Sequence, residues 1–193
     1  MRDALIVSTA RTPLTKSYRG TFNNTTAPTM AGWAIEEAVK RSGVDPEKVD
    51  DVIMGAALQQ GTQHCNVARN SALAAGLPVT VSGMTLDRQC SSGMMAIATA
   101  AKQIISDGMD VAVGGGLDSI SLVQTEKMNL DRWVDKKLIE KHKHIYMPML
   151  KTAEVVADRY NISRESQDEY SLQSQLRTAK AQLEGKFDDE IVS

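Results

Sequence analysis

The first 120 residues alternate between short apolar segments and amphipathic segments with helical spacing. The apolar segments predict strands and the amphipathic ones predict helices. The predicted strands are residues 4–8, 49–54, 79–86 and 111–113, and the predicted helices are residues 30–41, 66–75 and 90–108. Alternation of this kind predicts an α/β fold with a mainly parallel sheet that helices cover on both faces.

Cys90 stands where the predicted strand 79–86 gives way to a predicted helix, within the segment Asp-Arg-Gln-Cys-Ser-Ser-Gly at residues 87–93. Free N–H groups in the first turn of a helix, together with the positive end of its macrodipole, favour thiolate over thiol and can hold a developing oxyanion. Helical spacing predicts that Cys90 begins the buried face, in a stripe with Met94, Ile97, Ala101 and Ile104. A buried cysteine at a helix start is often structural. The small residues Ser91, Ser92 and Gly93, however, leave room for a ligand near the backbone, which favours a nucleophile.

Two other sequence features have a predicted structural role. The glycines at 114–116 lack the spacing of a phosphate-binding loop, so we interpret them as places where backbone approaches backbone near Cys90. Further along, Ser166-x-x-Glu169 fits a capping box, Leu172, Leu176, Ala179 and Leu183 form a stripe, and Gly185 closes the predicted helix.

The segment around Cys90 resembles the nucleophile motif of the thiolases, which commonly reads Asn-Arg-Gln-Cys-Ser-Ser-Gly in the 3-ketoacyl-CoA branch. Six further segments follow in thiolase order: Ala10-Arg11-Thr12-Pro13 with Arg19-Gly20 and Phe22; Val52–Gly55; Asn66–Arg69; Gly114–Gly116 with Ser119; Thr152-Ala153-Glu154; and Phe187–Val192. The resemblance therefore extends over nearly all 193 residues. It implies a layered αβα domain with a mainly parallel sheet of the five-stranded type at residues 1–119, lacking its last strand, and the first part of a helical loop domain that binds coenzyme A at residues 120–193.

The same resemblance implies a reaction. A thiolase forms or cleaves a carbon–carbon bond between acyl-CoA units through an acyl thioester, which here would form on Cys90, and the Cys90 backbone N–H would contribute to the oxyanion hole. Met149 matches a methionine that lines the acyl pocket, for which ordinary packing is the alternative. Coenzyme A and acyl-CoA would be substrates, with no tightly bound cofactor. The charged stretch 126–144 is either a solvated surface excursion or a cationic edge near the nucleotide and phosphates of coenzyme A.

The resemblance has departures. The family's Gly-His-Pro and Cys-x-Gly-Gly-Gly motifs belong to a C-terminal half and do not occur here. We therefore expect a complementary C-terminal chain or fragment as a partner, and homo-oligomers formed through the N-terminal half. Leu117-Asp118 and Leu150-Lys151 also differ from the usual family residues, which leaves the preferred acyl length open.

Composition restricts the remaining possibilities. The formal net charge is −2, which gives no indication of a nucleic-acid partner. Two cysteines do not make a disulfide framework, and no signal peptide or membrane-spanning run occurs, so we expect a cytoplasmic protein. We expect no metal site, because the adjacent His64 and Cys65 are a poor ligand pair. Two alternative functions stay open: a ketoacyl-synthase-like condensing enzyme, and a non-catalytic acyl-CoA-binding or scaffolding subunit.

Overall fold

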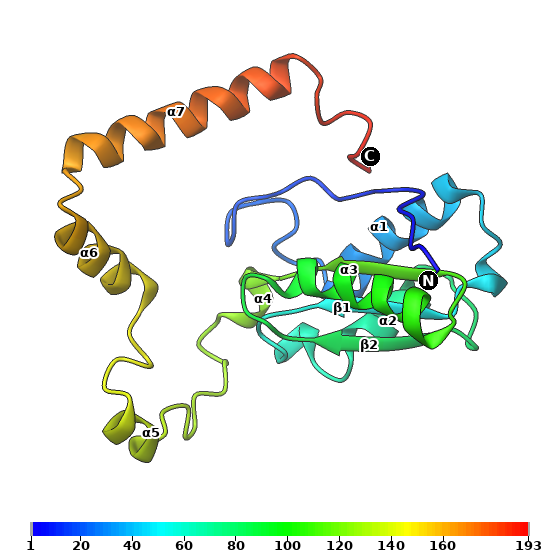
Figure 1. Cartoon of the computed structure of the whole chain (residues 1–193), viewed down its shortest axis with the longest axis horizontal. Helices are drawn as coiled ribbons and strands as arrows, with labels where there is room; N and C mark the ends of the chain where they lie inside the picture. Colours follow the sequence, from blue (N-terminus) through cyan, green and yellow to red (C-terminus); the bar gives the residue numbers. More distant parts are fainter. Residues whose placement is uncertain (1, 193) are drawn as a thin grey trace. The chain divides into compact units, whose positions relative to one another are not determined.

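A computed structural model describes residues 2–192, and they divide into two compact units (Figure 1). Unit 1 contains the described residues up to Met128 together with those from Glu190 onward, and unit 2 is Asn129–Asp189. The domain boundary expected from the family resemblance, at residue 119, stays a prediction.

Unit 1 is built on a parallel sheet, as the alternation predicts. Its strands are β1 (Asp51–Gly55), β2 (Ser82–Leu86) and β3 (Ala112–Gly116), in the order β2-β1-β3. Both pairings are parallel, and the register places Ile53 opposite Met84 on one side and Gly114 on the other. All five residues of β1 are buried, because β1 lies between two strands and between two layers of helices.

Helices cover both faces of this sheet, which confirms the layered αβα arrangement. Val52 and Met54 of β1 pack with residues of α1 (Ala27–Ser42) and α2 (Val67–Ala74). Ile53, between them in sequence, packs with Ala96 and Ala100 of α3 (Ser92–Lys102). Successive side chains of a strand point to opposite faces, so one strand supplies both halves of the core. Figure 1 shows α3 in front of the sheet.

Residues 4–8, predicted as a strand, pair with no other strand, and within residues 2–192 the sheet has three strands rather than five. The side chains of Leu5, Ile6 and Val7 are 69–78% exposed. The neighbouring residues bond to α1 instead: Ser8 Oγ donates to the Ala38 carbonyl at 2.6 Å, and Arg41 donates to the Thr9 carbonyl at 3.0 Å. An apolar run is insufficient for a strand, because a strand also requires a neighbouring backbone to share its hydrogen bonds.

Short helical turns and caps connect these elements. Asp45 caps the 3₁₀ turn η1 (Pro46–Lys48), and a second turn, η2 (Gly61–Gln63), precedes α2. Gly43 and Gly76 follow α1 and α2 with φ of 69° and 77°, values that suit glycine. A four-residue helix, α4 (Ile120–Val123), follows β3.

The α3 helix is shorter than predicted and buries a different face. It begins at Ser92, becomes a π-helix, η3 (Gln103–Asp107), and is followed by Gly108 with φ 81°. Its buried residues are Ser92, Ala96 and Ala100, whereas the side chains of Met94 and Ile97 are 78% and 46% exposed. The prediction that the large apolar residues face the core was therefore wrong.

The reason is that α3 packs on glycines. A Cβ added to Gly55 would lie 2.2 Å from the carbonyl carbon of Ser92, and one added to Gly114 would lie 2.8 Å from Cα of Ile97. The backbone of the helix therefore rests almost directly on the sheet, where only small side chains fit. The interpretation of Gly114–Gly116 as places of close backbone approach is confirmed for Gly114 and Gly116, whereas Gly115 faces the side chain of Met54.

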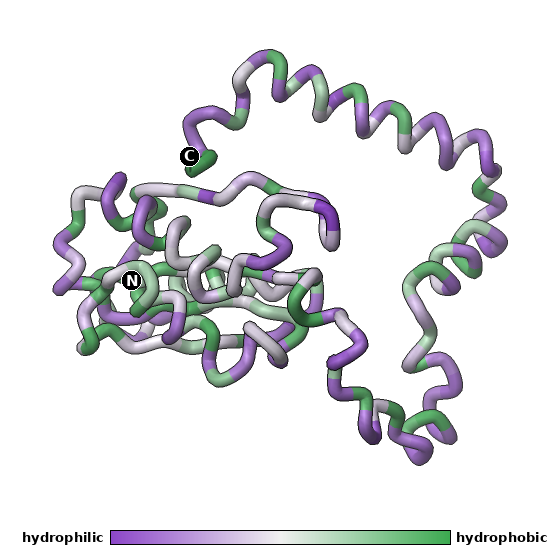
Figure 2. Tube along the Cα trace, turned by 180° about the vertical axis from the view of Figure 1, so that it is seen from behind, coloured by the Kyte–Doolittle hydropathy of each residue, from purple (hydrophilic) through white to green (hydrophobic). Residues whose placement is uncertain are grey.

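Unit 2 consists of three helices joined by irregular segments: α5 (Lys136–Lys141), α6 (Met149–Tyr160) and α7 (Arg164–Leu183). The cap of α7 is Ser163, one turn before the predicted capping box, and Gly185 follows its end with φ 66°. The backbone N–H of Glu165 and the Ser163 hydroxyl hold the pKa of Glu165 below its usual range, as suits a carboxylate in the first turn. Figure 2 shows hydrophobic residues recurring along α7 among hydrophilic ones, and none of its side chains is buried.

Candidate active site at Cys90

The three strands end at the same edge of the sheet, and the turn that holds Cys90 lies there. Residues 87–91 connect Leu86, the last residue of β2, to Ser92, the first residue of α3. Cys90 is a free, exposed thiol two residues before the helix. The position beside a helix start is as predicted, but the placement on the buried face was wrong, because the buried series of α3 begins at Ser92.

Hydrogen bonds between side chains and backbone hold this turn. Asp87 Oδ1 accepts a bond from the Gln89 N–H at 2.7 Å. Ser92 Oγ accepts from the Arg88 N–H at 2.8 Å and donates to the Gln89 carbonyl at 2.6 Å. Two backbone bonds complete the turn, from Ser91 N–H to the Arg88 carbonyl and from Ser92 N–H to the Gln89 carbonyl. Gln89 has φ 50°, a left-handed conformation that is unusual for a residue other than glycine or asparagine.

The first turn of α3 rests on the ends of β1 and β3. Gly55 lies against Ser92, and a Cβ added to Gly116 would lie 2.8 Å from Cα of Gly93. The Leu117 N–H donates to the Gly55 carbonyl at 3.0 Å, which ties the two strand ends together. Cys90 is therefore carried by a turn whose base is packed backbone to backbone.

A buried glutamine joins the loops that follow β1 and β3. Gln63, 1% exposed, donates through Nε2 to the Leu58 carbonyl at 2.9 Å and to Asp118 Oδ1 at 3.0 Å. Its Oε1 accepts a bond from the Ser119 N–H. Both ends of the Gln63 amide are thus bonded, which satisfies this buried polar group and fixes the two loops to each other.

The roles of Ser92 and Gln63 are not apparent from the sequence. Ser92 was expected to leave space for a ligand, yet its side chain is buried and bonded within the turn. Local sequence carries a weak signal for such a turn, since aspartate and serine often bond to nearby backbone. The Gln63 interactions join residues 55 positions apart, so no local pattern predicts them.

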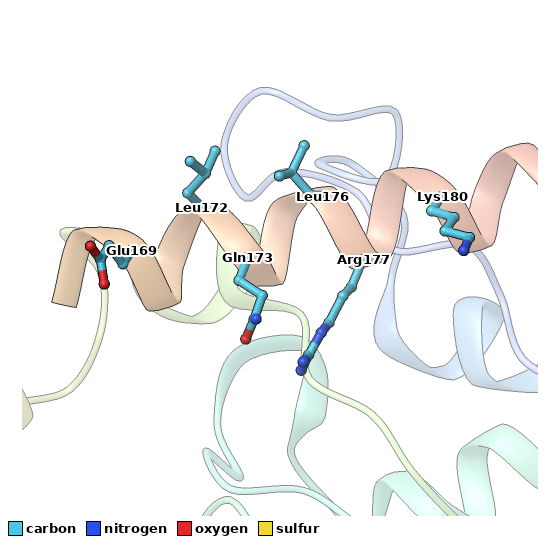
Figure 3. Close-up of a pocket in the computed structure, with 6 residues that line it drawn as sticks. All are labelled: Glu169, Leu172, Gln173, Leu176, Arg177 and Lys180. Atoms are coloured by element: carbon cyan, nitrogen blue, oxygen red, sulfur yellow. The ribbon is translucent and has the colours of Figure 1, made fainter. Parts of the chain in front are cut away.

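The other candidate residue, Met149, is the first residue of α6 and its side chain is 77% exposed. It belongs to unit 2, whereas Cys90 belongs to unit 1, and its role in an acyl pocket stays a prediction. A shallow hollow in unit 2 is lined by α7 alone (Figure 3): Glu169, Leu172, Gln173, Leu176, Arg177 and Lys180. Because one exposed helix forms the hollow, no groups from different elements converge there.

Proton-transfer partners for Cys90 are not found among residues 2–192. No titratable side chain in this range is hydrogen-bonded to Cys90, and the three histidines are all exposed. His64 follows η2, and His142 and His144 belong to unit 2. Across the same range, no group of three or more histidine, cysteine, aspartate or glutamate side chains could hold a metal ion. None of the described helices is long and apolar enough to cross a membrane.

Comparison with known proteins places the chain in one family. The family model for the N-terminal domain of thiolase matches residues 4–193, and the chain belongs to the thiolase family. It is 41% identical over 192 residues to a 3-ketoacyl-CoA thiolase of Bacillus subtilis, covering 100% of this chain and 49% of that protein. It is 38% identical over 202 residues to an acetyl-CoA acetyltransferase of Cupriavidus necator, covering 100% of this chain and 51% of that one.

A solved structure also resembles this chain. The crystal structure of the Bacillus anthracis acetyl-CoA acetyltransferase matches with a TM-score of 0.86 and 39% sequence identity, over 100% of this chain and 50% of that one. The chain thus spans about half the length of the relatives it matches. The names of these relatives describe a thiolase and acetyltransferases that act on acetyl-CoA.

Proposed function

We propose that this chain supplies the nucleophile of a thiolase that forms or cleaves the carbon–carbon bond of a 3-ketoacyl-CoA. The observation that carries the proposal is the exposed Cys90 thiol on a turn held at the head of α3. An exposed thiol beside a helix N-terminus suits attack on an acyl group, because the positive end of the helix favours the thiolate.

In the proposed reaction, Cys90 sulfur attacks the carbonyl carbon of an acyl-CoA, and coenzyme A leaves as its thiolate. The acyl group is then held as a thioester on Cys90. A second acyl-CoA, deprotonated at its α-carbon, attacks that thioester, which releases a 3-ketoacyl-CoA and restores the Cys90 thiolate. Cleavage is the reverse sequence. The Cys90 backbone N–H would stabilise the oxyanion in the acylation steps.

A segment that matches the other half of the relatives would supply the proton-transfer groups, either as a complementary chain or fragment or as a further part of the same polypeptide. Two observations support this part of the proposal. The chain spans about half the length of the relatives it matches. In addition, Met94 and Ile97 of α3 form an exposed apolar face on the helix that begins beside Cys90. A contiguous exposed apolar face is typical of an interface.

The remaining assignments extend the same proposal. Acyl-CoA is the substrate, Met149 lines the acyl pocket, and the charged stretch 126–144 lies near the nucleotide and phosphates of coenzyme A. The enzyme is a dimer or tetramer formed through this N-terminal half. A cytoplasmic location stays a prediction, since the relatives include peroxisomal plant proteins as well as bacterial ones.

The test is acylation of Cys90. After the partner-bound chain is mixed with acetyl-CoA, mass spectrometry of the digested protein should show an acetyl group on Cys90. Cys65 is a matched control, because it is a second exposed free thiol in the same molecule. Cys90→Ala should abolish the adduct, and Cys65→Ala should leave it. Equal acetylation of both cysteines would contradict a dedicated nucleophile.

The same experiment separates the alternatives. Affinity for coenzyme A without an adduct on Cys90 would favour a non-catalytic acyl-CoA-binding subunit. An adduct formed from acyl carrier protein and not from acyl-CoA would favour a ketoacyl-synthase-like condensing enzyme. The 3-ketoacyl-CoA thiolase and acetyl-CoA acetyltransferase among the relatives favour acyl-CoA as the donor.

A further inference from the structure

We propose that Ser92 is a positioning residue for Cys90, whose buried hydroxyl holds the turn in the form that presents the thiol at the head of α3. This inference rests on the proposed function, in which Cys90 is the nucleophile. It assigns Ser92 no contact with substrate, since its hydroxyl is already bonded within the turn.

The hydroxyl of Ser92 bonds to the backbone on both sides of Gln89. It accepts from the Arg88 N–H at 2.8 Å and donates to the Gln89 carbonyl at 2.6 Å. Ser92 is 4% exposed, so water has little access to replace these bonds. A hydroxyl is the smallest side-chain group that can donate and accept at once. Alanine would leave the Arg88 N–H without this acceptor, and the Gln89 carbonyl would keep only its bond from the backbone N–H of residue 92.

The turn needs this support because of Gln89. Its φ of 50° is unfavourable for a residue with a Cβ, and such a conformation persists only where the surroundings impose it. The Ser92 bonds hold the peptide group that follows Gln89 and the one that precedes Arg88. The peptide group between them, which carries the Gln89 N–H, is held by Asp87 Oδ1. Cys90 is the next residue, so the orientation of its own N–H and thiol depends on the conformation of Gln89.

Ser92 is itself held by the sheet. Its carbonyl carbon lies where a Cβ on Gly55 would come within 2.2 Å, so the backbone of Ser92 is packed against the end of β1. The path of support therefore runs from β1 through Ser92 and Gln89 to Cys90. Without the hydroxyl, the turn can relax while Ser92 stays in place, and the thiol is then less often beside the first N–H groups of α3.

The neighbouring Ser91 provides a matched control. It is exposed, it is the N-cap of α3, and its side chain makes no capping hydrogen bond. Ser92→Ala and Ser91→Ala thus delete the same hydroxyl from adjacent residues, one bonded within the turn and one not. Both variants are made in a Cys65→Ala background, so that Cys90 is the sole thiol.

The experiment measures the rate at which iodoacetamide alkylates Cys90 as a function of pH. Near neutral pH, Ser92→Ala should slow alkylation by about 3- to 10-fold, because the helix start stabilises the thiolate less effectively, and Ser91→Ala should change it by less than about twofold. At pH values well above about 8.5, the ordinary pKa of a cysteine thiol, the difference in alkylation rate should vanish, since every thiol is then ionised. A change in the access of iodoacetamide to the exposed Cys90 sulfur would instead alter the rate by the same factor at every pH.

Two results would overturn the proposal. One is a Ser92→Ala protein that melts at a lower temperature but shows the same pH profile of alkylation, which would mean a structural role alone. The other result comes from amide hydrogen exchange and needs no variant. The Arg88 N–H should be protected by at least about 10-fold relative to an unstructured peptide. An unprotected Arg88 amide would contradict the bond to Ser92. Alkylation uses no acyl-CoA, so these results are independent of whether Cys90 accepts an acetyl group.

Discussion

Asp87 gives the Cys90 turn a negative charge where the resembled motif commonly has asparagine. Its carboxylate is exposed and accepts the Gln89 N–H, a bond that an asparagine carbonyl can also accept. The charge is therefore unnecessary for the turn, and it stands three residues from Cys90, whose sulfur would react as a thiolate in the proposed function. Like charges close together disfavour the ionised form.

We predict that Asp87→Asn raises the rate of Cys90 alkylation at neutral pH by about twofold at low ionic strength, with a smaller gain in about 1 M salt, where the Debye length is about 3 Å. Asp107→Asn is the control, since it removes the same charge from the far end of the continuous α3 and η3 helix. An equal increase in alkylation rate from both substitutions, or an increase that does not depend on salt concentration, would contradict a local charge effect.

At the residue scale, sequence locates the exposed thiol better than the groups that support its turn. The place of Cys90 beside a helix start could be predicted because a thiol, its small neighbours and a helix start are adjacent in the chain, whereas its role as the nucleophile stays a prediction. Ser92 was recognised as small but its bonds were not, because they depend on the turn closing on itself. Gln63 could not be predicted at all, because Asp118 and Ser119 come near it only when β1 and β3 pair.

At the element scale, the packing of α3 on glycine strands determines how precisely the helix is placed. Gly114 and Gly115 are adjacent in β3 and face opposite layers, so they allow a matched comparison. A Cβ on Gly114 would meet Cα of Ile97 at 2.8 Å, whereas one on Gly115 would meet the side chain of Met54 at 3.2 Å and 3.3 Å. Backbone cannot move aside locally, but a methionine side chain can.

We therefore predict that Gly114→Ala lowers the free energy of unfolding by about 2–3 kcal/mol and that Gly115→Ala lowers it by less than about 1 kcal/mol. Urea denaturation followed by circular dichroism would measure both. Similar losses for the two variants would mean that α3 shifts freely on the sheet, in conflict with the close backbone contact.

The order and type of most elements could be predicted from periodicity, whereas two errors have physical causes. Residues 4–8 have the composition of a strand but no paired backbone among the described residues. The predicted buried face of α3 was wrong because periodicity assumes that large apolar side chains point to the core. Glycines in the sheet bring this helix so close that only small side chains fit between helix and sheet.

At the scale of the whole molecule, the exposed face of α3 should make the isolated chain associate. Met94 is 78% exposed and Ile97 is 46% exposed, on the helix that covers one face of the sheet. Burial of apolar surface contributes roughly 25 cal/mol per Å², so a face of this kind favours contact with another surface.

We predict that Met94→Glu reduces concentration-dependent association of the isolated chain, seen by sedimentation velocity, and changes the free energy of unfolding by less than about 0.5 kcal/mol. Leu14→Glu is the control, because Leu14 is 93% exposed and lies outside α3. If both substitutions reduced association equally, general hydrophobicity rather than the α3 face would be responsible.

The chain segments before and after unit 2 both belong to unit 1, and they are bonded to each other there. The Arg11 N–H donates to the Glu190 carbonyl at 2.9 Å, the Val192 N–H donates to the Arg11 carbonyl at 2.8 Å, and Arg11 Nε pairs with Glu190 Oε1 at 2.9 Å. The chain thus leaves unit 1 after Met128 and is fastened to it again at Glu190. Residues 129–189 are therefore an insertion whose two ends are both held by unit 1, and none of the sheet pairings lies within it. A change in the length of this insertion would therefore leave the strand register, and with it the base of the Cys90 turn, as it is.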